Sequence, residues 1–160
     1  MKNGRPNDLN AVQVWIYLGA VLFLVALLVS AILVPELRVL QAFQALIYVA
    51  VIVLARRKSS WGYGAGFAVA IVWNAMSLFV THLMQTGAIA FWSWLRTGHA
   101  AQPVPMMVTL GGVGHFILII ATPLALLRNN VEAKKFWKFA GGGAIAVAYL
   151  ALLVVFFHPR

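Results

Sequence analysis

The 160-residue chain contains no cysteine and only three acidic residues, and both shortages exclude chemistry. Without cysteine there is no disulfide, no thiolate nucleophile and no cysteine-ligated metal or iron–sulfur cluster. Asp8, Glu36 and Glu132 fall at the ends of apolar stretches or between them, so the apolar stretches hold no carboxylate pair for general acid–base catalysis. The lack of a buried acid also argues against proton-coupled transport through an acidic relay. These absences favour a protein that is not an enzyme.

Charge of either sign is also scarce. Charged residues make up 9% of the chain, against roughly 25% in soluble domains, and 63% of the residues are hydrophobic. A spanning helix needs about 17–25 mostly apolar residues, and the chain holds five stretches of that kind. The sequence therefore predicts an all-α, polytopic membrane protein, a compact antiparallel bundle that forms one domain over residues 1–160. Spanning helices are expected at about 9–34, 39–55, 61–84, 104–127 and 137–157, with a short interfacial helix, rich in Trp and Phe, at 88–96.

The basic residues are divided unevenly between the two sides of the predicted bundle. Only Arg38, Arg96 and Arg160 fall on one side, and the positive-inside rule places that side, with the C-terminus, outside. We expect a bacterial inner-membrane protein with a cytoplasmic N-terminus. The net charge of +9 is a topology signal and not a nucleic-acid-binding patch, because no solvated face carries it. The cytoplasmic basic residues are Lys2, Arg5, Arg56, Arg57, Lys58, Arg128, Lys134, Lys135 and Lys138, of which Arg56, Arg57, Lys58, Lys134, Lys135 and Lys138 are expected to contact anionic lipid headgroups.

A few polar side chains interrupt the apolar segments, and the stretch "GGVGH" places His115 directly after three glycines. Counting 1.5 Å per helical residue puts His115 and Asn74 at a similar depth, roughly 15 Å below the outer surface. Because an unpaired polar group in lipid is costly, we expect a neutral His115 hydrogen-bonded to Asn74, to Ser77 or to a backbone carbonyl. The predicted intramembrane polar cluster comprises Gln41, Gln44, Tyr48, Asn74, Ser77 and His115.

Two metal-binding alternatives stay open. In the first, His115 is a single axial ligand of haem, and the glycines make room for the porphyrin. His82 lies some 13 Å higher by residue count, so a bis-histidine haem does not fit. In the second, imidazole and thioether groups at the outer surface bind copper, although methionine is also ordinary packing material. That group consists of His82, Met84, His99, Met106 and Met107, with His158 as a further member.

Small residues recur at helical spacing on the third, fourth and fifth predicted helices, for example at Gly66, Ala70 and Asn74. Such faces allow two helices to approach closely. The chain has more of these faces than the packing of one five-helix bundle requires, which points to partner subunits. Our leading hypothesis is a non-enzymatic accessory, anchoring or assembly subunit of a larger membrane complex, or a homo-oligomer. One alternative is a haem- or copper-binding redox or metal-handling protein. The other is a small-molecule or lipid carrier whose site, in the outer half of the bundle, uses the polar cluster.

Overall fold

The computed structural model describes residues 11–100, 102–128 and 133–157, and every regular element in these ranges is helical. Five segments are long and apolar enough to cross a membrane, which confirms the predicted all-α class and the number of candidate spanning segments. Lys2, Arg5, Asp8, Glu132, His158 and Arg160 lie outside the described residues. The elements are α1 (Ala11–Leu33), η1 (Pro35–Leu37), α2 (Arg38–Arg56), α3 (Ser60–Ala75), η2 (Met76–Val80), α4 (Leu83–Thr97), α5 (Pro103–Arg128) and α6 (Ala133–Phe157).

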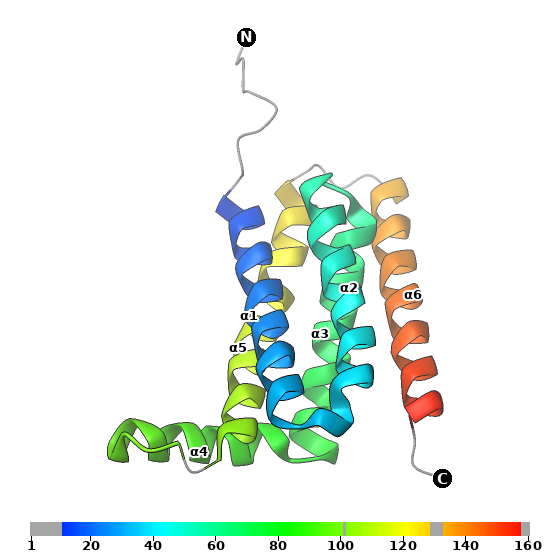
Figure 1. Cartoon of the computed structure of the whole chain (residues 1–160). Helices are drawn as coiled ribbons and strands as arrows, with labels where there is room; N and C mark the ends of the chain where they lie inside the picture. The colour runs from blue at the N-terminus through cyan, green and yellow to red at the C-terminus, as the bar shows by residue number, and fades with distance from the viewer. Residues whose placement is uncertain (1–10, 101, 129–132, 158–160) are drawn as a thin grey trace.

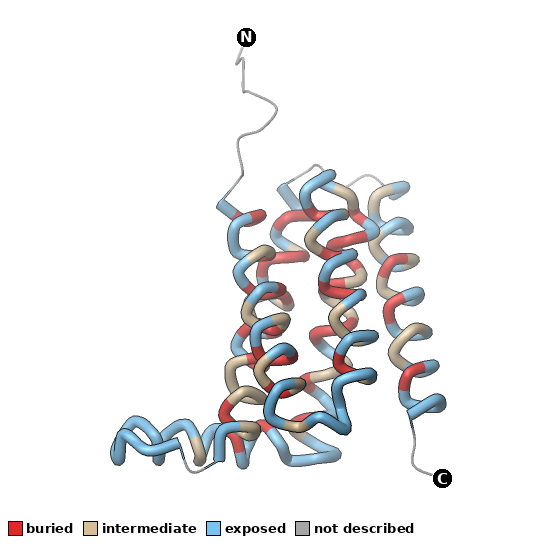
Figure 2. The backbone as a smooth tube through the Cα atoms, viewed as in Figure 1, coloured by how far each residue is buried: buried red, intermediate tan, exposed pale blue. Residues whose placement is uncertain are grey.

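The five long helices stand side by side, and α4 lies across one end of them (Figure 1). The most extensive packing joins α1 to α5 and α3 to α6, and α3 also packs on α5. Because α2 packs on α1 and α3, the four helices α1, α2, α3 and α5 enclose a common interior. Helix α6 is attached outside this group along α3, makes little contact with α2, and buries few of its residues (Figure 2).

Glycines set the closest helix–helix approaches. At the α1–α5 crossing, a Cβ on Gly19 would lie 2.6 Å from the carbonyl oxygen of Gly114. At the α3–α6 contact, a Cβ on Gly64 would collide with the backbone of Phe139, and one on Gly142 with the backbone of Trp61. Backbones can meet this closely only where no side chain intervenes. Gly114 and Gly142, two of the small residues that suggested partner subunits, are therefore used for packing within the chain.

The third predicted helix ends earlier than expected. A single helix over 61–84 and an interfacial helix over 88–96 are wrong in their bounds, because α3 passes into the π-helix η2 and α4 begins at Leu83. The Thr81 amide closes the last wide turn on the Met76 carbonyl at 2.9 Å. His82 then takes a left-handed conformation with φ +53°, which turns the chain out of the helix axis. Neither glycine nor proline marks this break, so no stop signal is visible in the sequence.

The other boundaries fall close to the expected ones, apart from the start of α6. This helix begins at Ala133 instead of residue 137. Lys134 and Lys135 consequently belong to its first turn and not to a loop.

Candidate functional site

His115 on α5 lies in the interior that α1, α2, α3 and α5 enclose, with an exposed fraction of 0%. Its Nε2 atom is 2.6 Å from the hydroxyl oxygen of Tyr48, and its Nδ1 atom is 3.3 Å from Oδ1 of Asn74. A neutral imidazole protonated on Nδ1 satisfies both contacts, because Nδ1–H donates to Asn74 and Nε2 accepts the Tyr48 hydroxyl proton. Each ring nitrogen of His115 therefore has a hydrogen-bond partner.

Aromatic rings close the space around this imidazole. The Phe23 ring from α1 stacks on it with a centroid distance of 4.1 Å, and the Trp73 ring from α3 meets it edge-on at 4.8 Å. A Cβ on Gly111, one turn before His115, would lie 2.8 Å from the Phe23 ring. Gly111 therefore makes room for Phe23 to reach the imidazole. We name the group of Phe23, Tyr48, Trp73, Asn74 and His115 the central cluster.

The predicted polar residues divide among three places. Tyr48, Asn74 and His115 meet in the central cluster, and of the three partners considered for His115, namely Asn74, Ser77 and a backbone carbonyl, Asn74 is the one in hydrogen-bond contact. Gln44 and Ser77 line a separate cavity between α2, α3 and α6, and Gln41 lines another between α1 and α2.

The role of Tyr48 as the closer partner of His115 was not predicted. Tyr48 lies ten residues after Arg38, the first residue of α2, which corresponds to about 15 Å along the helix. That depth equals the one derived for His115. The residue count that paired His115 with Asn74 would therefore have found Tyr48 as well.

The two described histidines considered for metal binding at the outer surface, His82 and His99, lie far apart. His82 and His99 flank opposite ends of the 15-residue helix α4, about 22 Å apart by helical rise. Met84 fills the notch at Gly112, where an added Cβ would collide with the methionine methyl group. Met106 and Met107 lie in the first turns of α5, Met106 buried and Met107 partly buried. Within the described ranges no three His, Cys, Asp or Glu residues are grouped as metal ligands.

A haem iron at His115 would have to replace an existing contact. It would take the place of the Tyr48 hydroxyl at Nε2 or of the Asn74 carbonyl at Nδ1. The Phe23 ring, stacked at 4.1 Å, occupies one face of the imidazole. The geometry around His115 is that of a packed, hydrogen-bonded side chain.

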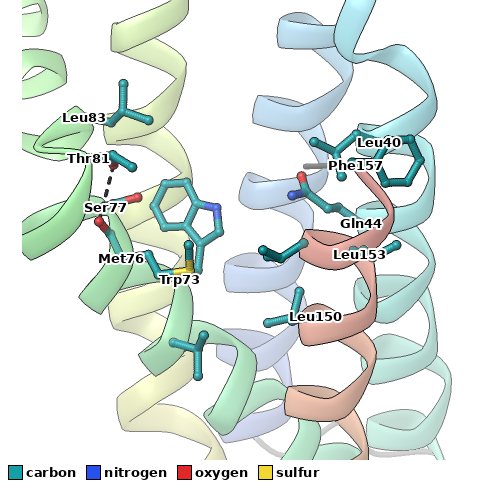
Figure 3. A pocket seen from close by; sticks show the side chains of 12 residues that line it. Leu40, Gln44, Trp73, Met76, Ser77, Thr81, Leu83, Leu150, Leu153 and Phe157 are labelled. Atoms are coloured by element: carbon teal, nitrogen blue, oxygen red, sulfur yellow. Dashed lines mark hydrogen bonds between the residues drawn. The ribbon is translucent and has the colours of Figure 1, made fainter. Parts of the chain in front are cut away.

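Beside the central cluster lies a cavity of about 320 Å³, which we name the α2–α6 pocket (Figure 3). Trp73 belongs to both sites, because its ring contacts His115 and also forms part of the pocket wall. The Gln44 side chain from α2 and the Trp73 indole face one another across the pocket in Figure 3, and Ser77 adds a hydroxyl on the α3 side. The remaining wall is largely apolar and includes Leu40, Leu83, Leu150, Leu153 and Phe157.

The groove between α2 and α6 continues past this pocket. A second cavity of about 290 Å³ lies between the same helices, with Trp61, Ala65 and Ile145 in its wall. The Tyr149 hydroxyl from α6 donates to the Phe43 carbonyl of α2 at 2.7 Å and so ties the two helices together across the groove. No charged side chain lines either cavity among the described residues.

A cavity of this size with apolar walls and a few polar groups is the usual form of a small-molecule site, whose lower size limit is about 300 Å³. The polar groups at the α2–α6 pocket are neutral and offer both hydrogen-bond donors and acceptors. The chain matches no protein-family model, no curated protein and no solved structure, so the function has to be inferred from this geometry.

Proposed function

We propose that the protein is a non-enzymatic carrier in the bacterial inner membrane that binds an uncharged amphiphile in the α2–α6 pocket. The observation that carries this proposal is the cavity of about 320 Å³ with the Gln44 amide and the Ser77 hydroxyl set in apolar walls. Inside a membrane, a polar group that faces a cavity has a high free energy when it is unpaired. A ligand that hydrogen-bonds to such a group lowers that free energy and is therefore bound more tightly. We infer a ligand with a carbonyl or hydroxyl group on an apolar body.

The lack of charge in the pocket wall narrows the ligand class. Transferring an ionised carboxylate or ammonium into such a site without a counter-charge would cost far more than the hydrogen bonds return. A hydroxyl or carbonyl group loses little free energy of hydration on entering the pocket, because the neutral groups of Gln44 and Ser77 replace its hydrogen bonds to water. Fatty alcohols, monoacylglycerols and ketones with apolar tails meet this requirement.

We further propose an antiparallel arrangement in the membrane with a cytoplasmic N-terminus. The α2–α3 connection, the C-terminal end of α5 and the N-terminal end of α6 lie at the same end of the bundle in Figure 1, and the basic residues near them are predicted to contact anionic headgroups. At the other end, α4 exposes Ile89, Trp92 and Leu95, with exposed fractions of 72%, 56% and 55%. The Arg96 guanidinium lies 4.9 Å from the centre of the Trp92 ring. Such a helix suits the membrane–water interface.

The test compares two ligands of equal chain length, 1-oleoylglycerol and oleate, added to the purified full-length protein in mild detergent. Native mass spectrometry then measures the fraction of protein that carries each ligand. We expect 1-oleoylglycerol to bind more tightly than oleate by at least about tenfold, because the oleate carboxylate would lie in a pocket without a cation. Equal binding of the two ligands would contradict the proposal.

Two variants on α6 localise the binding. Leu153→Trp fills the pocket, because Leu153 is 7% exposed and lines it. Val155→Trp is the matched control, since Val155 is 74% exposed and does not line the pocket. We expect only Leu153→Trp to abolish binding of 1-oleoylglycerol. The carrier role would be overturned if Leu153→Trp still bound 1-oleoylglycerol, or if the wild type did not bind it. The accessory-subunit or homo-oligomer role would then be favoured, and crosslinking in native membranes is its test.

A further inference from the structure

The second cavity of the groove between α2 and α6 lies toward the end of the bundle where α6 begins. Its volume is about 290 Å³, and Trp61 of α3 forms part of its wall. We name it the Trp61 cavity. It shares no lining residue with the α2–α6 pocket, so its occupancy does not depend on the proposed carrier function.

The Trp61 cavity is apolar and open to the surrounding membrane. Ile145 and Trp61, from opposite sides of its wall, have exposed fractions of 64% and 38%. An acyl chain can therefore enter the cavity sideways without separating the helices. A volume of about 290 Å³ has room for about ten methylene groups, counted at roughly 30 Å³ each.

The face of α6 that lines this cavity continues into a lysine. Lys138 precedes Gly142 by four residues and Ile145 by seven, and both of these residues line the cavity. Residues four and seven apart lie on the same face of a helix, so Lys138 extends the lining face by one turn, about 6 Å beyond Gly142. Lys138 is exposed, so a ligand in the cavity can reach its ammonium group.

The lining face of α2 ends in the same way. Arg57, the C-cap residue of α2, is exposed and follows the lining residues Leu54 by three positions and Ala50 by seven. The α2–α3 connection and the start of α6 lie at the same end of the bundle in Figure 1. Two cations from two helices therefore flank the same mouth of the cavity. Tryptophan favours the headgroup level of a membrane, and Trp61 lies at this mouth.

The described part of the chain supplies no counter-charge for these two cations. Glu36 is the one acidic residue within it, and Glu36 lies in η1, which precedes the opposite end of α2. A guanidinium and an ammonium group that flank an apolar groove at a membrane surface suit a lipid phosphate. The charge thus defines the headgroup, and the groove defines a place for an acyl chain.

We propose that the Trp61 cavity binds one anionic phospholipid, whose phosphate lies between Arg57 and Lys138 and of which one acyl chain fills the cavity. The Arg57 guanidinium can donate to two phosphate oxygens, and Lys138 adds a point charge. Predicted headgroup contacts at six basic residues are thereby narrowed to a discrete site at two of them. Because α2 and α6 make little direct contact, the bound lipid would also connect these helices.

The test is a titration of the full-length protein with dioleoylphosphatidylglycerol and, separately, with dioleoylphosphatidylcholine, read by native mass spectrometry. The two lipids have the same chains and both carry a phosphate, but the choline ammonium offsets its charge. We expect phosphatidylglycerol to bind at least about tenfold more tightly, since each nearby basic residue contributes about fivefold to the binding of an anionic lipid. Equal affinity for the two lipids would overturn the proposal.

Charge variants separate a discrete site from general attraction to a basic surface. Lys138→Gln and Arg57→Gln should each weaken binding of phosphatidylglycerol by about fivefold. Arg128→Gln is the matched control, because Arg128 is exposed at the same end of the bundle but belongs to α5, which does not line the cavity. An equal loss in Arg128→Gln would show that the attraction is diffuse and would refute the site.

Two variants on α2 locate the acyl chain. Ala50→Trp fills the cavity from an exposed lining position, whereas Val49→Trp places the same ring at the next position, which is 48% exposed and does not line it. Only Ala50→Trp should weaken binding of phosphatidylglycerol, by about tenfold or more, in protein that circular dichroism shows to be folded. Binding that survives in Ala50→Trp would refute the placement of the chain. Leu153→Trp, which fills the α2–α6 pocket, should leave this binding unchanged, so the two proposals fail independently.

Discussion

Replacing Tyr48 with phenylalanine tests the central cluster most selectively. The substitution removes only the hydroxyl that lies 2.6 Å from His115 Nε2. The ring stays, and with it the contact to Phe23 at a centroid distance of 4.4 Å. Any change in stability therefore reports the hydrogen bond and the unpaired imidazole nitrogen that its loss leaves behind.

Two ranges bound the expected magnitude. A buried acceptor left without its partner costs about 1–3 kcal/mol in soluble proteins. Side-chain hydrogen bonds in a membrane protein average about 0.6 kcal/mol and reach about 1.7, because the unfolded chain in the membrane finds other partners. His115 is fully buried under Phe23 and Trp73, so no lipid or water replaces the lost donor. We expect Tyr48→Phe to lower the free energy of unfolding by about 1.5 kcal/mol, near the upper end of the membrane range.

The assay is reversible unfolding in bicelles, measured for Tyr48→Phe, for His115→Leu and for the double variant. If the bond contributes as described, the coupling energy in this double-mutant cycle is about 1–1.5 kcal/mol, because Tyr48→Phe costs little once His115 is absent. A coupling energy below about 0.3 kcal/mol, within the error of additivity, would refute the inference that the Tyr48–His115 contact stabilises the fold.

The remaining predictions concern packing and topology. Gly64→Ala should lower the free energy of unfolding by about 2 kcal/mol or more, because its new methyl group meets helix backbone, whereas Gly112→Ala should cost less, because the flexible end of Met84 can move. Equal losses in a bicelle unfolding assay would contradict this difference. The chain has no cysteine, so Ser59→Cys and His99→Cys each give a single thiol. A membrane-impermeant maleimide added to intact cells should label only His99→Cys, and labelling of Ser59→Cys would reverse the proposed orientation.

Depth counting along helices was enough to pair His115 with Asn74, because the two residues lie at similar distances from the outer ends expected for their helices. It did not separate Gln44 and Ser77 from His115, although the structure places them in a different cavity. Residue counts give the height of a side chain in a helix but not its direction around the axis relative to neighbours that are distant in sequence. That direction depends on which helices pack together, here on the attachment of α6 along α3.

The glycines were also only partly interpretable from the sequence. A glycine on a predicted spanning helix indicates close approach but not what approaches. In the structure Gly114 meets the backbone of α1, Gly111 meets the Phe23 ring and Gly112 meets Met84. The porphyrin considered for this stretch competes with these contacts. The exact position of the break at His82 could not be predicted, because a histidine with positive φ leaves no mark in composition or periodicity.

The carrier role is tested most directly by identifying the lipids that stay bound to the protein when it is extracted from its own membrane. Wild-type, Leu153→Trp and Val155→Trp chains are extracted in polymer nanodiscs without detergent, and the lipids retained per chain are quantified by mass spectrometry. We predict one uncharged amphiphile enriched in near-stoichiometric amount with the wild type and with Val155→Trp, and absent from Leu153→Trp, because only Leu153 lines the α2–α6 pocket. The same lipid profile in all three samples, without an enriched uncharged species, would contradict the carrier role.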